Sequence, residues 1–355
     1  MNILVIGKFY TEGFALHIAE TLMTMGHTVQ RFEPGFRSNR SGGRLWHRVD
    51  QVWGAFHTAT DAVPSVRAWR IGALWKVAEQ GPLEVVIVCH DFLLPAEVAE
   101  LKEHTGALVT LWFPDAAVNL GRAYFMNALY EVLFFKDPYI VHILDGVLGS
   151  PVYYLPECFN PARHSFSAGD AEDLEGYRCE ITTAGNQHSY RTAFFKHLAT
   201  YDVKLWGPPA PLWLDTGPVK KMYQGRSVLN EDKARAFRAA KIVVNNLHFG
   251  EVWGVNVRTF ETAGAGGFQL VDWRPGLGQL FEDGKELISF KGIKDLKHKI
   301  DYYLAHDDER LEIAQAGMVR AEREHTYSHR LNLLLETLSG RARGFEMPEI
   351  SYGSK

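Results

Sequence analysis

The sequence predicts an α/β protein with two domains, each built on a doubly wound parallel sheet. Short apolar runs alternate with stretches of helical spacing along the chain, which is typical of strands and helices wound in turn. This alternation starts twice, at residue 2 and again after the proline-containing stretch 155–161. The length of 355 residues also exceeds the ~100–200 residues of a typical single domain.

The first half of the chain opens with an apolar run at 2–6, a helical stretch at 11–26 and a second apolar run at 28–32. A strand, a loop, a helix and a strand in this order are the usual start of a doubly wound domain. Further apolar runs lie at 83–88, 107–112, 133–136 and 152–155, and another helical stretch lies at 95–103. We expect these elements to form an N-terminal Rossmann-like domain over residues 1–155.

The boundary between the halves is the stretch LPECFNP at 155–161, because its two prolines and its Asn-Pro step interrupt regular structure. Past it, strands are expected at 180–183, 203–206, 242–244 and 268–271, and helices at 190–198, 231–241, 295–305 and 308–324. We expect a C-terminal Rossmann-like domain over residues 156–330. Residues 331–355 are expected to form a helix that packs back toward the N-terminal domain, followed by a loose tail.

The composition argues against several classes of protein. The net charge is −4, from 38 basic and 42 acidic residues, which disfavours a protein that wraps nucleic acid. The cysteines Cys89, Cys158 and Cys179 have no spacing typical of a metal site or a disulfide framework, which fits a reducing compartment. Residues 1–7 are too short for a signal peptide, and no apolar run reaches the ~20 residues of a membrane span. We therefore expect a cytoplasmic protein.

Residues 33–56 stand out because they combine four arginines and two tryptophans with serines and glycines. We interpret this stretch as a mobile, solvated loop that enters a helix whose aromatic residues join the core. The alternative is a loop that recognises an acceptor or a membrane surface.

The most polar stretch of the second half, NNLHFGEVWGVNVRTFETAGAGGFQLVD, runs from 245 to 272 and connects two apolar strands. In parallel sheets, ligands bind at the carboxyl ends of strands, near helix N-termini. Asn256 and Thr259 lie where a helix is expected to begin, and Arg258 supplies a cation for a pyrophosphate in the first turn. Glu261 is placed to accept the hydroxyl groups of a ribose. The alternative is a helix carboxylate that pairs with Arg258 or Arg274.

Several stretches resemble known glycosyltransferases. LPECFNP resembles the interdomain linker of GT-B glycosyltransferases, and GRSVLNEDKARAFRAAKIVVNN resembles the segment leading to their donor site. GEVWGVNVRTFETAGAGGFQLVDWRPGLGQLFEDGKE, with YYLAHDDERLEIAQAG and HTYSHR, resembles the CgeB-like, spore-coat-type family of the two-glutamate GT-B group. The resemblance covers roughly residues 179–330 and is only architectural over 1–150. It implies two Rossmann-like domains that face an interdomain cleft.

The resemblance also implies roles for the two glutamates of the polar stretch. Glu261 matches the second glutamate of the group, and Glu251 matches the first. The spacing between them is longer here than in the broader group. Glu251 is therefore expected either to reach the hydroxyl groups of the sugar as a catalytic-site residue or only to cap the helix.

Two loops complete the expected donor site. Gly185 and Asn186 match the G-N loop of the family, and Arg191 is the nearest cation on the following helix. The alternative for Arg191 is a surface arginine. Gly225 and Arg226 match the loop that flanks the nucleobase, where contacts tend to be made by the backbone.

The catalytic base is expected from the first domain, where polar residues follow two strands. Asp115 is our first candidate and His90 our second, because transfer to a hydroxyl can use a base within hydrogen-bond reach. An inverting enzyme needs such a group, whereas in a retaining enzyme the donor phosphate can take the proton. The alternative for each residue is a loop position that caps the next helix.

We expect a hexosyltransferase-like glycosyltransferase that moves a sugar from a nucleotide diphosphate sugar, a UDP-sugar first of all. No D-x-D motif or ligand spacing indicates a metal, so we expect metal-independent transfer. Acceptors left open are a protein, a glycan, a lipid, a small molecule and a modified base. Epimerase or phosphorylase chemistry on the same fold is one alternative. A non-catalytic envelope or spore-type assembly protein with a degenerate donor site is the other.

Overall fold

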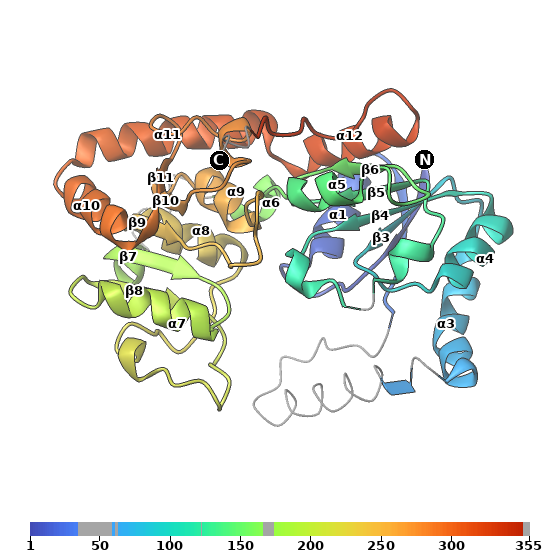
Figure 1. Cartoon of the computed structure of the whole chain (residues 1–355), viewed down its shortest axis with the longest axis horizontal. Helices are drawn as coiled ribbons and strands as arrows, with labels where there is room; N and C mark the ends of the chain where they lie inside the picture. The colour runs from blue at the N-terminus through green and yellow to red at the C-terminus, as the bar shows by residue number, and fades with distance from the viewer. Residues whose placement is uncertain (35–58, 61–62, 122, 166–173, 351–355) are drawn as a thin grey trace. The chain divides into compact units, whose positions relative to one another are not determined.

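The structure, a computed structural model, describes residues 1–34, 59–60, 63–121, 123–165 and 174–350 (Figure 1). The chain folds into two compact units. Unit 1 comprises Met1–Phe135, Val141–Leu155 and Leu331–Gly344, and unit 2 comprises Lys136–Ile140, Pro156–Arg330 and Phe345–Lys355. The arginine-rich stretch at 33–56 lies, from residue 35 onward, outside the described residues. No helix in the described part of the chain is long and apolar enough to cross a membrane.

Unit 1 is built on a six-stranded parallel sheet with the order β2-β1-β3-β4-β5-β6. Its strands are β1 (Asn2–Ile6), β2 (Thr28–Phe32), β3 (Val85–Cys89), β4 (Leu108–Phe113), β5 (Val132–Phe135) and β6 (Val152–Tyr154). Its helices are α1 (Phe14–Thr24), α3 (Pro64–Ala78), α4 (Pro95–Thr105), η1 (Ala117–Asn119), η2 (Tyr124–Asn127), most of α5 (Pro138–Leu144) and most of α12 (Tyr327–Leu338). All five residues of β3 are buried, as expected for a strand covered on both faces.

Unit 2 holds a five-stranded parallel sheet with the order β11-β10-β9-β7-β8. Its strands are β7 (Cys179–Ala184), β8 (Val203–Trp206), β9 (Ala240–Asn245), β10 (Gln269–Asp272) and β11 (Ile288–Phe290). Its helices are α6 (Pro161–His164), α7 (Ser189–Phe195), η4 (Lys196–Leu198), η5 (Gly217–Val219), α8 (Asn230–Ala239), α9 (Val257–Gly264), η6 (Leu277–Gln279), α10 (Gly292–Leu304) and α11 (Asp307–Glu324). Ile181, Ile242 and Leu270 from neighbouring strands lie together in one hydrophobic core.

The predicted fold class is confirmed, because both sheets are parallel throughout and doubly wound. Where single elements differ from the expectation, the cause is local. The helix expected at 231–241 ends at Ala239, since Ala240 already pairs with Cys179 in the sheet. Helix α3 has no clear apolar period because its buried face includes Arg67, which donates from Nε to Glu97 Oε1 (2.7 Å).

The segment after α12 is not loose where the structure describes it. The ring of Phe345 lies 4.8 Å from the guanidinium carbon of Arg330, and the carbonyl oxygen of Met347 accepts a hydrogen bond from Gln279 Nε2 (2.6 Å). Arg330 is itself buried and donates to the carbonyl oxygen of Pro156 (3.1 Å). These contacts fix the segment to unit 2, and a hydropathy pattern gives no sign of them because each is a single aromatic or backbone contact.

In each sheet the strand order reverses once, and the crevice at such a switch point is where open α/β sheets bind ligands. In unit 1 the reversal lies between β1 and β3, which are followed by Gly7 and His90. In unit 2 it lies between β7 and β9, which are followed by Gly185 and Asn246. The topology alone therefore puts candidate site residues at both switch points.

Candidate functional site

Two arginines converge on Gly185 at the carboxyl end of β7. A Cβ atom on Gly185 would lie 2.7 Å from Arg258 Nη2 and 2.9 Å from Arg191 Nη1. The φ angle of Gly185 is +136°, a conformation that residues with a side chain rarely adopt. Glycine is thus required here both by the backbone and by the guanidinium groups beside it. The loop and both cations predicted from the sequence come together at this point.

Arg191 is buried without a polar partner. It is 4% exposed, and within the described residues its Nε and Nη1 atoms have no hydrogen-bond acceptor. Burial, and after it the charge of Arg258, lowers the pKa of the Arg191 guanidinium. A guanidinium still stays protonated at neutral pH, so this lowering reflects a poorly solvated charge. Arg191 is therefore a buried cation and not the surface arginine of the alternative interpretation.

Arg258 is partly buried and held in place by the backbone and by one asparagine. Its Nε donates to the carbonyl oxygen of Ala184 (2.7 Å), and its Nη1 donates to Asn245 Oδ1 (2.9 Å). Burial lowers the pKa of Arg258 to about 10 against the opposing effect of nearby carboxylates, so the group is charged at pH 7. Two of its nitrogens are thereby fixed, and Nη2 is left beside Gly185.

Asn245 organises the start of α9. Its Nδ2 atom donates to Asn256 Oδ1 (3.0 Å) and to Thr259 Oγ1 (2.9 Å). Thr259 is fully buried. Asn256 and Thr259, which the sequence predicts as ligand contacts, both bond to the asparagine that holds Arg258. Asn245 itself is a residue that the sequence reasoning missed, and its only signal is a polar residue at the end of an apolar strand.

Glu261 lies one turn after Arg258 in α9 and is 6% exposed. Its Oε1 atom accepts a hydrogen bond from Lys233 Nζ (2.8 Å) and lies 3.6 Å from His164 Nε2. Within the described residues, the ion-pair partners of Glu261 thus include Lys233 and His164, whereas the alternative interpretation expected Arg258 or Arg274. Lys233 in α8 therefore holds the carboxylate of Glu261 in place.

Glu251 belongs to a buried cluster of charges. Lys136 Nζ donates to Glu251 Oε1 (2.8 Å) and to Glu157 Oε2 (3.1 Å), and all three side chains are at most 10% exposed. Burial alone lowers the pKa of Lys136, but the two carboxylates raise it more, so the net shift is upward. Glu251 does not cap α9. It pairs with a lysine that stands 115 positions earlier in the chain.

Asp137, next to that lysine, supports the loop before α9. Its carboxylate accepts hydrogen bonds from the backbone N–H groups of Val252 (2.7 Å), Trp253 (3.1 Å) and Gly254 (3.2 Å). Gly254 passes so close that a Cβ atom would lie 2.8 Å from the carbonyl oxygen of Lys136. The segment Lys136–Ile140 of unit 2 therefore acts as a brace for the loop that carries Glu251.

Replacing Asp137 by alanine is expected to lower the free energy of unfolding by about 2–3 kcal/mol, because three N–H groups lose a charged acceptor. Asp137→Asn retains one acceptor oxygen and is expected to lose roughly half as much. Guanidinium-induced unfolding of both variants measures the difference. Equal and negligible losses in the two variants would contradict the role of Asp137 as a brace.

Gly225 and Arg226 lie on the same carboxyl edge, next to β8. The carbonyl oxygen of Arg226 accepts a hydrogen bond from the backbone N–H of Gly207. Gly207 in turn packs against Gly185, because a Cβ atom on Gly207 would lie 2.2 Å from the carbonyl oxygen of Gly185. The guanidinium of Arg226 lies 4.8 Å from the ring centroid of Trp206 and donates to Asp232 (2.6 Å). The side chain is half-exposed, so the loop presents a flat cation over Trp206. Asn186 is exposed next to Gly185.

The two base candidates of unit 1 contact each other. His90 Nε2 lies 3.3 Å from Asp115 Oδ2, and His90 Nδ1 lies 2.8 Å from its neighbour's carbonyl oxygen, Cys89 O. His90 has a φ angle of +79°, a strained value for a residue with a side chain. Both side chains are partly exposed at the ends of β3 and β4. The geometry gives a histidine–carboxylate pair at the switch point of unit 1.

Asp91, the residue after His90, has a different role. Its two carboxylate oxygens accept the backbone N–H groups of Tyr124 (2.6 Å) and Phe125 (2.9 Å). Burial raises the pKa of Asp91 against these hydrogen bonds. Asp91 thus fixes η2, and of the two adjacent polar residues only His90 faces Asp115.

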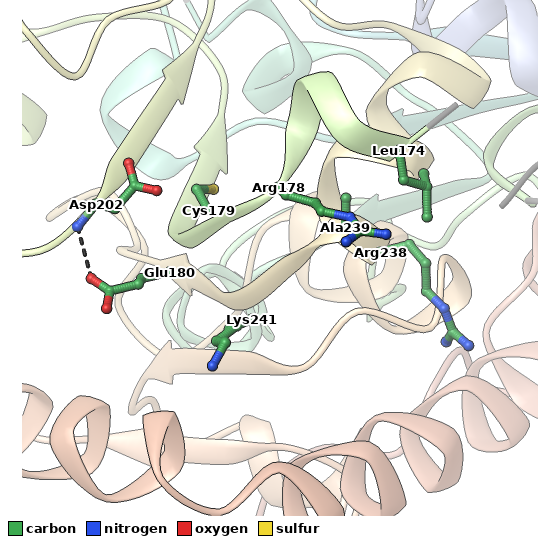
Figure 2. Close-up of a pocket in the computed structure, with 8 residues that line it drawn as sticks. All are labelled: Leu174, Arg178, Cys179, Glu180, Asp202, Arg238, Ala239 and Lys241. Carbon is green, nitrogen blue, oxygen red and sulfur yellow. Dashed lines mark hydrogen bonds between the residues drawn. The ribbon is translucent and has the colours of Figure 1, made fainter. Parts of the chain in front are cut away.

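A pocket of about 530 Å³ lies at another edge of unit 2 (Figure 2). Its lining includes Cys179, which begins β7, and Lys241 near the start of β9. Glu180 there accepts a hydrogen bond from the N–H of Asp202 (2.8 Å), which Figure 2 shows as a dashed line. The pocket therefore lies at the amino ends of the strands, opposite to Gly185. Ligands of parallel sheets bind at carboxyl ends, so we do not place the functional site in it.

Residues 190–336 match a family model described as glycosyl transferase-like. A search of curated proteins found no match. Among solved structures, the chain is similar to a glycosyltransferase from Rickettsia africae, with 12% identity and a TM-score of 0.65 over 96% of this chain and 98% of that chain.

Two further structures have the same architecture. HepE from Anabaena in complex with UDP-glucose has 11% identity and a TM-score of 0.61, over 96% of this chain and 100% of that chain. Sucrose-phosphate synthase from Thermosynechococcus elongatus has 11% identity and a TM-score of 0.59, over the same shares. At such identities the likeness concerns the fold. The chain has the GT-B fold of these proteins, and its segment 190–336 matches the glycosyl transferase-like family.

Proposed function

We propose that this protein is a glycosyltransferase that takes its sugar from a nucleotide diphosphate sugar, and that the diphosphate binds at Gly185 between Arg191 and Arg258. The observation that carries the proposal is the pair of guanidinium groups at the switch point of unit 2, one of them buried without an acceptor. Two adjacent cations repel each other unless an anion lies between them. A diphosphate has the charge and the oxygen atoms to satisfy both.

The rest of the nucleotide has suitable partners on either side of the arginine pair. We propose that Glu261, held by Lys233, accepts the ribose hydroxyl groups, and that the loop of Gly225 and Arg226 flanks the base. HepE binds UDP-glucose on the same fold, which supports uridine as the first base to test. The arrangement of loops also supports the proposed kinship with CgeB-like, two-glutamate enzymes.

In the proposed reaction, the bond between the anomeric carbon and the diphosphate oxygen breaks as an acceptor oxygen bonds to that carbon. The electron pair of the broken bond stays on the leaving nucleoside diphosphate, whose charge the two arginines stabilise. The proton of the acceptor hydroxyl passes to a base. We propose the Asp115–His90 pair of unit 1 for that task, because Asp115 has an exposed carboxylate at a strand end.

Replacing Glu261 by glutamine is expected to weaken the binding of UDP-glucose about tenfold or more, because a charged acceptor of the ribose hydroxyl groups is lost. Isothermal titration calorimetry measures the affinity of the wild type and the variant. The matched ligand is 2′,3′-dideoxy-UDP, whose affinity should be the same for both proteins. Wild-type affinity for UDP-glucose in the variant would refute the ribose assignment, and a wild type that binds no nucleotide diphosphate sugar would refute the proposed function.

A further inference from the structure

A histidine lies beside the arginine pair, at the end of the expected G-N loop, where the sequence assigns it no role of its own. His188 follows Gly185 by three positions and precedes Arg191 by three. Its Nδ1 atom accepts a hydrogen bond from the backbone N–H of Arg191 (3.4 Å). A neutral imidazole that accepts at Nδ1 carries its proton on Nε2. The half-buried ring therefore has one N–H donor to offer.

The groups that face His188 come from three elements. They are Arg191 on α7, Arg258 on α9 and His248 on the loop after β9, whose ring centroid lies 5.3 Å away. Burial, followed by these positive or titratable groups, lowers the pKa of His188 to about 4. The ring is therefore neutral above about pH 5, and Tyr190 and His248 limit its orientation.

We propose that His188 is a third hydrogen-bond donor of the diphosphate site and that it donates from Nε2 as a neutral imidazole. This inference rests on the proposed function and adds one residue and one protonation state to it. A third cation beside Arg191 and Arg258 would increase their mutual repulsion, whereas a neutral N–H group adds a donor without adding charge. The backbone hydrogen bond at Nδ1 fixes the tautomer that makes this donation available.

The variant that tests the role is His188→Asn. Asparagine is a good residue at the start of a helix, so it is expected to keep the acceptor for the backbone N–H of Arg191 and to leave α7 folded. Because its shorter amide does not replace Nε2, affinity for UDP-glucose is expected to fall about tenfold to a hundredfold. Affinity for uridine, which has no phosphate, should not change. Calorimetry with both ligands separates a phosphate contact from a general structural role.

The protonation state is tested by pH and by nitrogen NMR. UDP-glucose has no phosphate that titrates near neutrality, so wild-type affinity should be nearly constant from pH 6.5 to 8. If His188 instead had to gain a proton to bind the diphosphate, the affinity would rise up to about tenfold for each unit by which pH falls. The ¹⁵N shifts of the ring should show the Nε2–H tautomer with and without ligand.

Each outcome separates the two proposals. Binding of UDP-glucose that is equal in the wild type and in His188→Asn refutes the role of His188 and leaves the donor site intact. An equal loss of affinity for uridine and for UDP-glucose in His188→Asn also refutes the role. So does a wild-type affinity for UDP-glucose that changes tenfold per pH unit when that of the variant does not. If the wild type binds none of UDP-glucose, GDP-mannose and ADP-glucose, the proposed function fails first.

Discussion

Replacing Arg191 by methionine is expected to stabilise the fold while it strongly weakens binding of the sugar nucleotide. The guanidinium is 4% exposed, has no acceptor for Nε or Nη1 within the described residues, and lies beside Arg258 at Gly185. Removing such a charge relieves its desolvation and its repulsion of the second arginine. Methionine fills a similar volume with a flexible apolar chain, so little packing is lost. We expect a gain of about 1–3 kcal/mol in the free energy of unfolding.

The same substitution removes the donors that a diphosphate needs. Hydrogen bonds to charged groups contribute about 1.5–3 kcal/mol each, so affinity for UDP-glucose should fall roughly a hundredfold or more. Arg191→Lys is the matched control, because it keeps the charge but loses the planar fork. It should bind more weakly than the wild type without the gain in stability.

Differential scanning calorimetry and titration calorimetry of the two variants give both quantities. A melting temperature that falls in Arg191→Met would mean that the guanidinium supports the fold through partners such as ordered water. In that case the burial of Arg191 would not argue for an anion-binding role. A higher melting temperature together with unchanged affinity would place the diphosphate elsewhere.

The fold was predictable from the sequence because it depends on signals of short range. Apolar runs such as 2–6 and 203–206 coincide with β1 and β8, and the alternation with helices specifies parallel sheets. Hydrophobic periodicity did not predict the elements whose buried face carries a polar side chain. Helix α3 buries Arg67 against Glu97, and an ion pair between distant residues has no signature in hydrophobic periodicity.

Candidate site residues could be named from the sequence where a strand end or a helix start marks them, but not where a distant side chain supports them. Gly185, Arg191 and Arg258 are marked by their places after a strand and in the following helices, and the structure brings them together. Asn245 was missed because its role is to hold another side chain. Lys136 was missed because its partner Glu251 lies 115 positions away, and pairwise contacts at that separation follow only from the folded chain.

Replacing Lys136 by methionine is expected to lower the free energy of unfolding, whereas Arg191→Met is expected to raise it. Lys136 is the buried cation between Glu157 and Glu251, at 3.1 Å and 2.8 Å. Removing one partner of a buried ion pair leaves an uncompensated charge and typically costs about 3–5 kcal/mol. The variant leaves two carboxylates in that position, so we expect a loss at the upper end of this range.

The loss should depend on pH in a defined direction. In the wild type the pKa of Lys136 is raised in the folded state, so its contribution is complete at pH 7 and is lost only as pH rises through the alkaline pKa. In the variant, Glu157 and Glu251 lose the cation that Lys136 supplies, and burial then favours their protonated forms. Protonation removes the buried negative charges, so the difference in the free energy of unfolding between variant and wild type should shrink as pH falls from 7 toward 4.

The internal control is a triple variant that also carries Glu157→Gln and Glu251→Gln. With all three charges removed, neither ion pair of Lys136 is left half broken, and most of the lost stability should return at pH 7. Guanidinium-induced unfolding at pH 7 and pH 5 measures each step. If Lys136→Met alone lost little free energy of unfolding, and the loss did not depend on pH, solvent would be stabilising the two carboxylates. The brace of Lys136 and Asp137 would then act through backbone hydrogen bonds alone.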